Sequence, residues 1–169
     1  MPISMYQASI PVFVKTLGNL NAILDKAASF AEAKKVEPAT LFGMRLAPNM
    51  FPLSRQIQVA SDTSKGAAAR LAGTEPPSWE DKEAGFAEFK ARIEKTIAFC
   101  KEFKPAQIDG SENRDITIKA GGGRVLNFKG QPYLLHFVLP NFFFHVTTAY
   151  DILRHCGVEI GKRDYLGQD

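Results

Sequence analysis

The sequence predicts an all-α fold, an antiparallel four-helix bundle with a small β-hairpin inserted before the last helix. Apolar residues recur at spacings of three and four along four long segments, which is typical of helices that bury one face. Before the fourth segment the period changes to two on both sides of three consecutive glycines, which indicates a hairpin. A chain of 169 residues has the length of one domain, so we expect residues 1–169 to form a single domain.

The first helix is predicted from Pro11 to Lys35. Proline suits a first turn, because the N–H that it lacks would be unpaired there anyway. The residues that recur on its inner face are apolar: Phe13, Leu17, Leu20, Leu24, Ala27, Ala28 and Ala31.

The second and third helices are bounded by capping and breaking residues. The second is expected to begin near Asn49, whose side chain can accept backbone N–H bonds, and to end at Gly73. The third is expected to begin after Ser78 and to stop at Pro105. Their inner faces are marked by Met50, Leu53, Ile57, Ser64, Ala68 and Leu71, and by Phe86, Phe89, Ile93, Ile97 and Cys100.

The hairpin is predicted in DITIKAGGGRVLNFKG, residues 115–130. The last helix follows from Pro132 to Cys156, with a kink at Pro140, which cannot donate a hydrogen bond to the preceding turn. Gly157 can take the left-handed position that ends a helix. Val158 would then pack on Leu153, as in a Schellman motif, and the remaining tail would fold back over the bundle.

Composition and charge exclude several classes of protein. The net charge is +3, but basic and acidic residues are interleaved and no basic block occurs, so we expect no nucleic-acid partner. No apolar run is long enough to cross a membrane, and no secretory signal is visible at the N-terminus. Cys100 and Cys156 stand far apart and fit reduced thiols, so a cytoplasmic protein is expected.

The last helix carries the best functional candidate, His145, which follows three phenylalanines. At 100° per residue, Asn141, His145 and Thr148 form a polar strip on an otherwise apolar helix. Burying such groups without partners costs about 1–3 kcal/mol each, so they need partners. The strip therefore predicts either an interior pocket or a histidine that is hydrogen-bonded within the core.

Partners for His145 must come mainly from another helix. The second helix offers Gln58 and Asp62, which are four residues apart and share a face. Tyr150 could donate its phenol proton to a ligand. His155 lies about 15 Å along the helix axis from His145, and His136 falls nearly on the opposite side, so neither is expected to complete a metal site. The sequence thus identifies no cofactor, although His145 is the best candidate for a ligand to a divalent metal.

Two long blocks, LAPNMFPLSRQIQVASDTSKGAAARLAG and PNFFFHVTTAYDILRHCGVEIGKRDYLG, resemble a family of bacterial and fungal proteins known as a domain of unknown function. That family is related by fold to the DinB/YfiT-like proposed metalloenzymes, which are four-helix bundles and frequently dimeric. The resemblance therefore implies the same bundle and a homodimer.

The resemblance implies that three histidines converge on the metal in the metal-binding relatives. One comes from the second helix, and the other two form an HxxxH pair on the last helix. His145 matches the first histidine of that pair, and Ala149 stands where the second would be. The second helix has Gln58 and Asp62 but no histidine. The metal triad is thus incomplete at two of its three places.

Two hypotheses follow. In the first, a pocket between the second and last helices binds a small molecule beside His145, and this pocket is a degenerate metal site. In the second, the protein is a non-catalytic dimeric bundle and His145 is a structural core residue.

Overall fold

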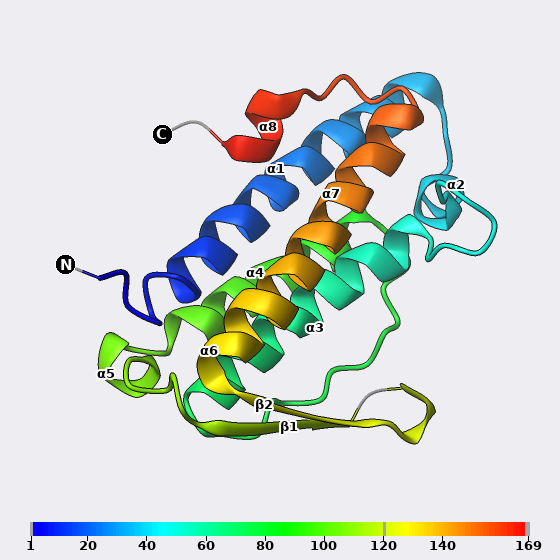
Figure 1. Ribbon diagram of the computed structural model, residues 1–169. Coiled ribbons are helices and arrows are strands. Elements are labelled where there is room, and N and C mark those ends of the chain that lie inside the picture. The colour runs from blue at the N-terminus through cyan, green and yellow to red at the C-terminus, as the bar shows by residue number, and fades with distance from the viewer. Residues whose placement is uncertain (1, 120, 168–169) are drawn as a thin grey trace.

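The computed structural model describes residues 2–119 and 121–167 and is mostly helical (Figure 1). Its four long helices are α1 (Ile10–Lys34), α3 (Leu53–Leu71), α4 (Phe86–Lys101) and α7 (Leu139–His155). Four shorter helices are α2 (Pro38–Gly43), α5 (Pro105–Ile108), α6 (Gly130–Pro132) and α8 (Lys162–Leu166). The predicted number of four therefore counts only the long helices. None of the described helices is both long and apolar enough to cross a membrane.

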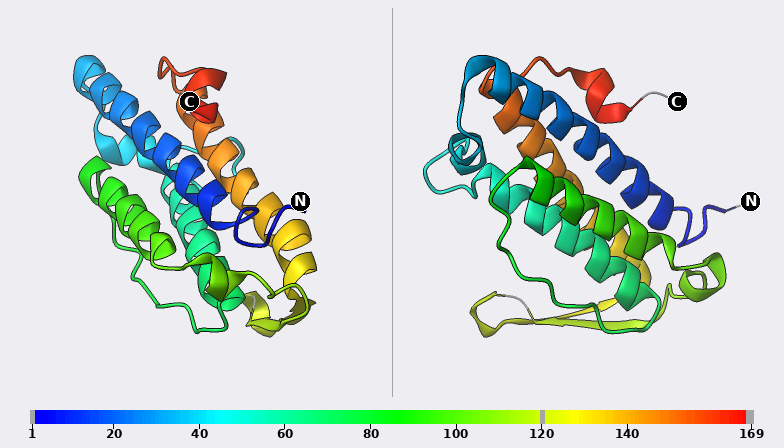
Figure 2. Two further views of the ribbon diagram at one scale, coloured as in Figure 1. Left: turned by 90° about the vertical axis from the view of Figure 1, so that its left-hand side faces the viewer. Right: turned by 180° about the vertical axis from the view of Figure 1, so that it is seen from behind.

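The directions of the long helices differ from the antiparallel prediction. Helix α3 packs against both α7 and α4, and α1 packs against α4 and α7. Asp62 of α3 pairs with Arg92 of α4, and one turn further along both helices Lys65 and Lys95 flank the same Trp79 ring. Helices α3 and α4 are therefore parallel, as Figure 2 shows, while α1 and α7 run the opposite way.

A long irregular connection, residues 72–85, makes this parallel arrangement possible. Helix α3 has 19 residues and is about 28 Å long. About 14 extended residues span up to about 46 Å, so the connection can return along the whole length of α3 before α4 begins. Short connections favour antiparallel neighbours, and the sequence analysis assumed a shorter loop here.

Arg92 fastens the 72–85 connection to the helices. The residue is 4% exposed, and its Nη1 donates to the backbone oxygen of Glu80 and to the carboxylate of Glu83. Nη2 pairs with Asp62 at 3.1 Å and with Asp81 at 2.9 Å. These contacts hold residues 80–83 outside a helix, so the prediction that the third helix begins at Ser78 is wrong, and α4 begins at Phe86.

The second long helix also begins later than predicted, at Leu53 instead of Asn49. Pro52 precedes it with an extended backbone (ψ 166°). Proline disfavours helical conformation in the residue before it, which keeps Phe51 outside the helix. The loop before Pro52 is tied back by a hydrogen bond from the N–H of Leu53 to the oxygen of Met44.

The predicted hairpin is confirmed as β1 (Asp115–Lys119) and β2 (Val125–Lys129), which pair antiparallel with Ile116 opposite Phe128. It lies across the end of the molecule where α3 finishes and the last helix starts (Figure 1). The buried side chain of Ile116 attaches it to the core.

A π-helical segment, Tyr133–Val138, lies just before Pro140, the residue at which the sequence predicts a kink. The N–H of Leu139 donates to the oxygen of Leu134, five residues back. Pro140 has no N–H to give to His136, so a wider turn just before it preserves backbone pairing that a regular helix would lose.

The end of α7 follows the prediction. The N–H groups of Gly157 and Val158 donate to the oxygens of Arg154 and Leu153, which is a Schellman motif, and Gly157 has a φ of 95°. The tail then folds back, and α8 packs on α1.

Replacing Arg92 by Met should lower the free energy of unfolding by about 3–5 kcal/mol, because three carboxylates would lose their buried cation. Lys90→Met is the matched control, since Lys90 pairs with the exposed Asp25 and such pairs contribute about 1 kcal/mol or less. Urea denaturation followed by circular dichroism measures both. Equal losses in the two variants would contradict this role of Arg92.

Candidate functional site

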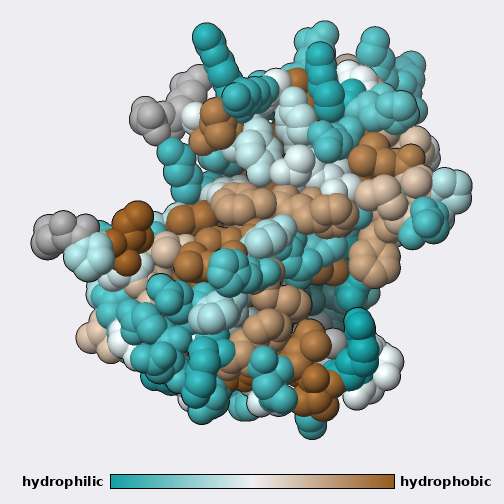
Figure 3. Space-filling model, viewed as in Figure 1, coloured by the Kyte–Doolittle hydropathy of each residue, from teal (hydrophilic) through white to brown (hydrophobic). Residues whose placement is uncertain are grey.

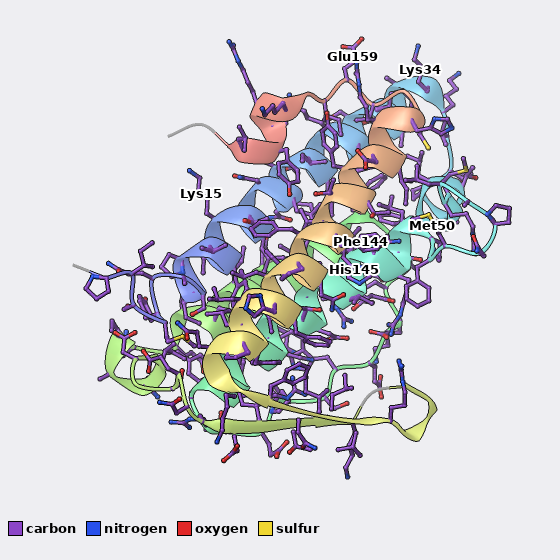
Figure 4. All side chains as sticks on the ribbon, in the orientation of Figure 1. Lys15, Lys34, Met50, Phe144, His145 and Glu159 are labelled. Carbon is purple, nitrogen blue, oxygen red and sulfur yellow. The ribbon has the colours of Figure 1, made fainter. Side chains whose placement is uncertain are left out.

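His145 lies on α7 and is turned toward the first turn of α3 (Figure 4). The residue is 7% exposed. Its Nδ1 is 2.6 Å from Oε1 of Gln56. The Nε2 amide nitrogen of Gln56 donates in turn to the backbone oxygen of Phe51, at 3.0 Å. A chain of two hydrogen bonds thus links the imidazole to the loop before α3.

This chain fixes the tautomer of His145. A backbone carbonyl only accepts hydrogen bonds, so the NH₂ group of Gln56 must face Phe51 and its oxygen must face the imidazole. An amide oxygen also only accepts, so Nδ1 of His145 carries the proton. The second ring nitrogen, Nε2, is left with a lone pair.

The imidazole is held neutral. Burial and, to a smaller extent, the nearby positive charge of Arg55 together lower the pKa of His145 from 6.5 to about 4. Arg55 belongs to the same turn of α3 as Gln56, and it forms an ion pair with Asp81 of the 72–85 connection. The site therefore offers an unprotonated nitrogen acceptor at neutral pH.

An aromatic side chain borders His145. The ring of Phe144 stands nearly perpendicular to the imidazole, with centroids 5.3 Å apart. Both Phe144 and Phe51 are exposed, and apolar side chains gather on the face of the molecule that α7 crosses (Figure 3). Among the described residues, Nε2 of His145 has no hydrogen-bond partner. A polar acceptor thus lies next to exposed apolar surface.

Two of the predicted partners face the other side of α3. The carboxylate of Asp62 pairs with Lys65 at 2.8 Å and with Arg92. The amide of Gln58 donates to Glu83 at 2.9 Å. Both side chains therefore hold the 72–85 connection and α4, and neither is bonded to His145.

The three predicted residues on α7 have partners of their own. Asn141 donates to Oγ1 of Thr63 at 3.3 Å, and Thr148 donates to the backbone oxygen of Phe144 at 2.7 Å. Tyr150 packs edge-on against Tyr165 of α8, with centroids 5.9 Å apart. The polar strip exists, but its members are paired separately, and His145 alone reaches Gln56.

Gln56 is the site residue that the sequence analysis missed. It follows the buried Leu53 by three residues and precedes the buried Ala60 by four, which puts all three on one face of α3. The helical phase of these two apolar neighbours was therefore a sufficient signal for Gln56.

The residues at this site do not fit the three-histidine metal centre that the resemblance implies. Gln56 occupies the α3 side, and its oxygen is already used by Nδ1 of His145. Ala149, one turn beyond His145, is fully buried, and its side chain has no atom that can bind a metal. Within residues 2–119 and 121–167, no three His, Cys, Asp or Glu side chains converge in a way that could hold a metal ion.

The comparisons with known proteins agree with the resemblance. Residues 5–166 match the model of a family described as Domain of unknown function (DUF1993). The chain belongs to this family. The solved structures include a similar one, the crystal structure of a DinB family member protein from Shewanella denitrificans. It is 41% identical, the match covers 97% of this chain and 92% of that one, and the TM-score is 0.88. No curated protein matches the chain.

The fold of this DUF1993 protein is thus DinB-like.

The lowered pKa of the buried His145 makes the stability of the protein depend on pH. In the unfolded chain the pKa of His145 is near 6.5, whereas in the native state it is about 4. Between these values the unfolded state binds a proton that the native state does not. The neutral, buried His145 therefore makes its full contribution to stability above about pH 6.5. This contribution falls as the pH is lowered toward 4, by up to about 1.4 kcal/mol per pH unit.

The unfolding free energy of wild type should therefore depend more steeply on pH between 6.5 and 4 than that of His145→Asn. The control is His155→Gln, at the exposed end of α7, which should keep the wild-type slope. Urea titrations at a series of pH values measure these slopes. The same slope in wild type and His145→Asn would show that His145 titrates normally.

Proposed function

We propose that this protein binds a small organic molecule at His145, with Nε2 accepting a hydrogen bond from an N–H or O–H group of the ligand. The observation that carries the proposal is the hydrogen-bond chain from Phe51 through Gln56 to His145. It sets the imidazole in the tautomer that accepts at Nε2. A histidine that served only as a core residue would also need a partner at Nδ1, but the acceptor at Nε2 is left available to a ligand.

The chemistry of the ligand follows from the surroundings of Nε2. The exposed ring of Phe144, which contacts the imidazole, offers apolar surface on which a flat ring can stack, and the Phe51 side chain of the loop before α3 is exposed as well. The guanidinium of Arg55 lies 5.9 Å from the centre of the Phe51 ring. A small aromatic molecule that carries one hydroxyl or amine group suits this combination.

Binding is favoured over acid–base catalysis. A general base works best when its pKa is close to the operating pH. With a pKa of about 4, His145 is unprotonated at pH 7 but has little affinity for a proton. It is well suited to accept a hydrogen bond and poorly suited to remove a proton from a substrate.

The alternative is that His145 is a structural core residue whose role ends with Gln56. The two hypotheses separate in a ligand-observed NMR experiment that uses phenol, with toluene as the isosteric probe that lacks the hydroxyl group. We expect phenol to bind more weakly to His145→Ala than to wild type by about tenfold, the value of one hydrogen bond. Toluene should bind both proteins equally.

The matched control is His136→Ala, an exposed histidine on the π-helical segment, which should bind phenol as wild type does. If phenol binds wild type and His145→Ala equally well, His145 is structural. The proposed ligand site would then be abandoned.

We also propose that the protein forms a homodimer through the outer face of α7 and the segment before it. Leu135 and Phe143 are exposed there, with Leu139 between them at a spacing of four residues. A row of apolar residues on one helix face is typical of an interface. Sedimentation equilibrium should show a dimer for wild type and a monomer for Phe143→Glu. A monomeric wild type at high micromolar concentration would refute the proposal.

A further inference from the structure

Two adjoining cavities lie at the other end of α3, between that helix, the hairpin and the π-helical segment. One has a volume of about 560 Å³ and is lined by the end of α3 and by β1. The other, of about 340 Å³, is lined by α3, β1, the π-helical segment and Asn141. Arg70 and Lys119 line both cavities. His145 lines neither.

Three cations border these cavities: Arg70, Arg114 and Lys119. Arg70 donates from Nη1 to the hydroxyl of Tyr133 at 3.3 Å. Among the described residues, none of the three cations forms an ion pair with a carboxylate. Three basic groups are therefore available to an external anion.

The nearby carboxylates do not cancel this charge. Asp115 pairs with Lys129 at 2.7 Å, and Asp62 is held by Lys65 and Arg92. Glu75 is the remaining acidic residue that lines either cavity. The two cavities together form a groove, here called the cationic groove. It thus has an excess of positive charge, which attracts anions to it.

Gly73 brings one of the arginines into place. It follows α3 with a φ of 78°, and a Cβ atom there would lie 1.7 Å from Nη1 of Arg114. Only a residue without a side chain leaves room for this guanidinium over the end of α3. The carbonyl groups at the C-terminus of a helix favour a cation in this place. Gly73 therefore leaves room for Arg114, which lines the larger cavity together with Arg70.

The smaller cavity adds an apolar wall. Phe137 and Val138 of the π-helical segment face it together with Ile118 of β1. Asn141 and Thr63, whose side chains are joined by a 3.3 Å hydrogen bond, supply polar atoms at its edge. π-helical turns within helices often occur at functional sites, because the wider turn changes the direction of the side chains beside it.

We infer that this groove is a second ligand site, which takes an organic anion with an apolar body. The carboxylate or phosphate head pairs with Arg70 and Arg114, since guanidinium groups bind such anions through paired hydrogen bonds. The apolar body lies against Phe137 and Ile118. The site is separate from His145, because Gln56 and Arg70 are in the first and last turns of α3, about 21 Å apart at 1.5 Å per residue.

The test uses 8-anilinonaphthalene-1-sulfonate, an aromatic anion whose fluorescence rises on binding. Arg70→Gln and Arg114→Gln should each raise its dissociation constant by about tenfold, the value of one charge-assisted hydrogen bond. Arg124→Gln is the matched control, because Arg124 is an exposed arginine of the hairpin that lines neither cavity.

Arg114 is exposed, so its variant tests the site even if Arg70→Gln fails to fold. Wild-type affinity in Arg114→Gln, or an equal loss in Arg124→Gln, would overturn the inference. Competition then tests the apolar half. Benzoate and phenyl phosphate should displace the dye, and whichever displaces it at lower concentration identifies the preferred head. Displacement by inorganic phosphate as effective as that by phenyl phosphate would overturn the assignment of an apolar body.

Discussion

The buried guanidinium of Arg92 is the interaction on which the arrangement of this molecule depends. It joins α4 to α3 through Asp62 and to the 72–85 connection through Asp81 and Glu83. Burial raises the pKa of Glu83, but hydrogen bonds from Arg92 and Gln58 outweigh it and leave that pKa below its ordinary value. Groups with this much buried charge gain little net stability, but they tolerate few alternative arrangements. The ion cluster therefore specifies a parallel α3 and α4 more than it strengthens them.

Helix α3 makes functional and structural contacts on two of its sides and at both of its ends. One side carries the polar groups that meet Arg92, and the other carries Gln56, which orients His145 of α7. Its first turn contributes to the histidine site, and its last turn contributes Arg70 to the cationic groove. In metal centres a neighbouring carboxylate or carbonyl commonly fixes the tautomer of a histidine. Here the amide of Gln56 does so in a place where the residues do not fit a metal.

The spacing of apolar residues and the positions of glycine and proline predicted much of this fold. The apolar stripe of α1, the alternation of the hairpin and Gly157 at the end of α7 each depend on local chemistry, and the structure has all three. The direction of α4 could not be predicted in this way, because a stripe has the same period in either direction. The start of α4 failed for a related reason. Ser78 is a good helix cap locally, but distant contacts with Arg92 hold the residues after it outside a helix.

The site was predicted less completely than the fold. His145 was identified from its place in an apolar helix, and its burial and pairing confirm that it needed a partner. The partner was assigned to Gln58 and Asp62, which face α4, because only the spacing of those two residues was considered. The helical phase set by the apolar Leu53 and Ala60 identifies Gln56 instead. The cationic groove was not predicted at all, since its arginines come from segments that only the hairpin brings together.

The most direct measurement of the central claim is the ¹⁵N NMR spectrum of the imidazole of His145, recorded from pH 8 to pH 4 on uniformly labelled protein. The account predicts that Nδ1 has the shift of a protonated nitrogen and Nε2 that of a nitrogen with a lone pair. It also predicts that this pattern persists until the pH approaches 4. The opposite tautomer, or a titration near pH 6.5, would contradict it, because Gln56 would then not be holding His145 as a neutral acceptor.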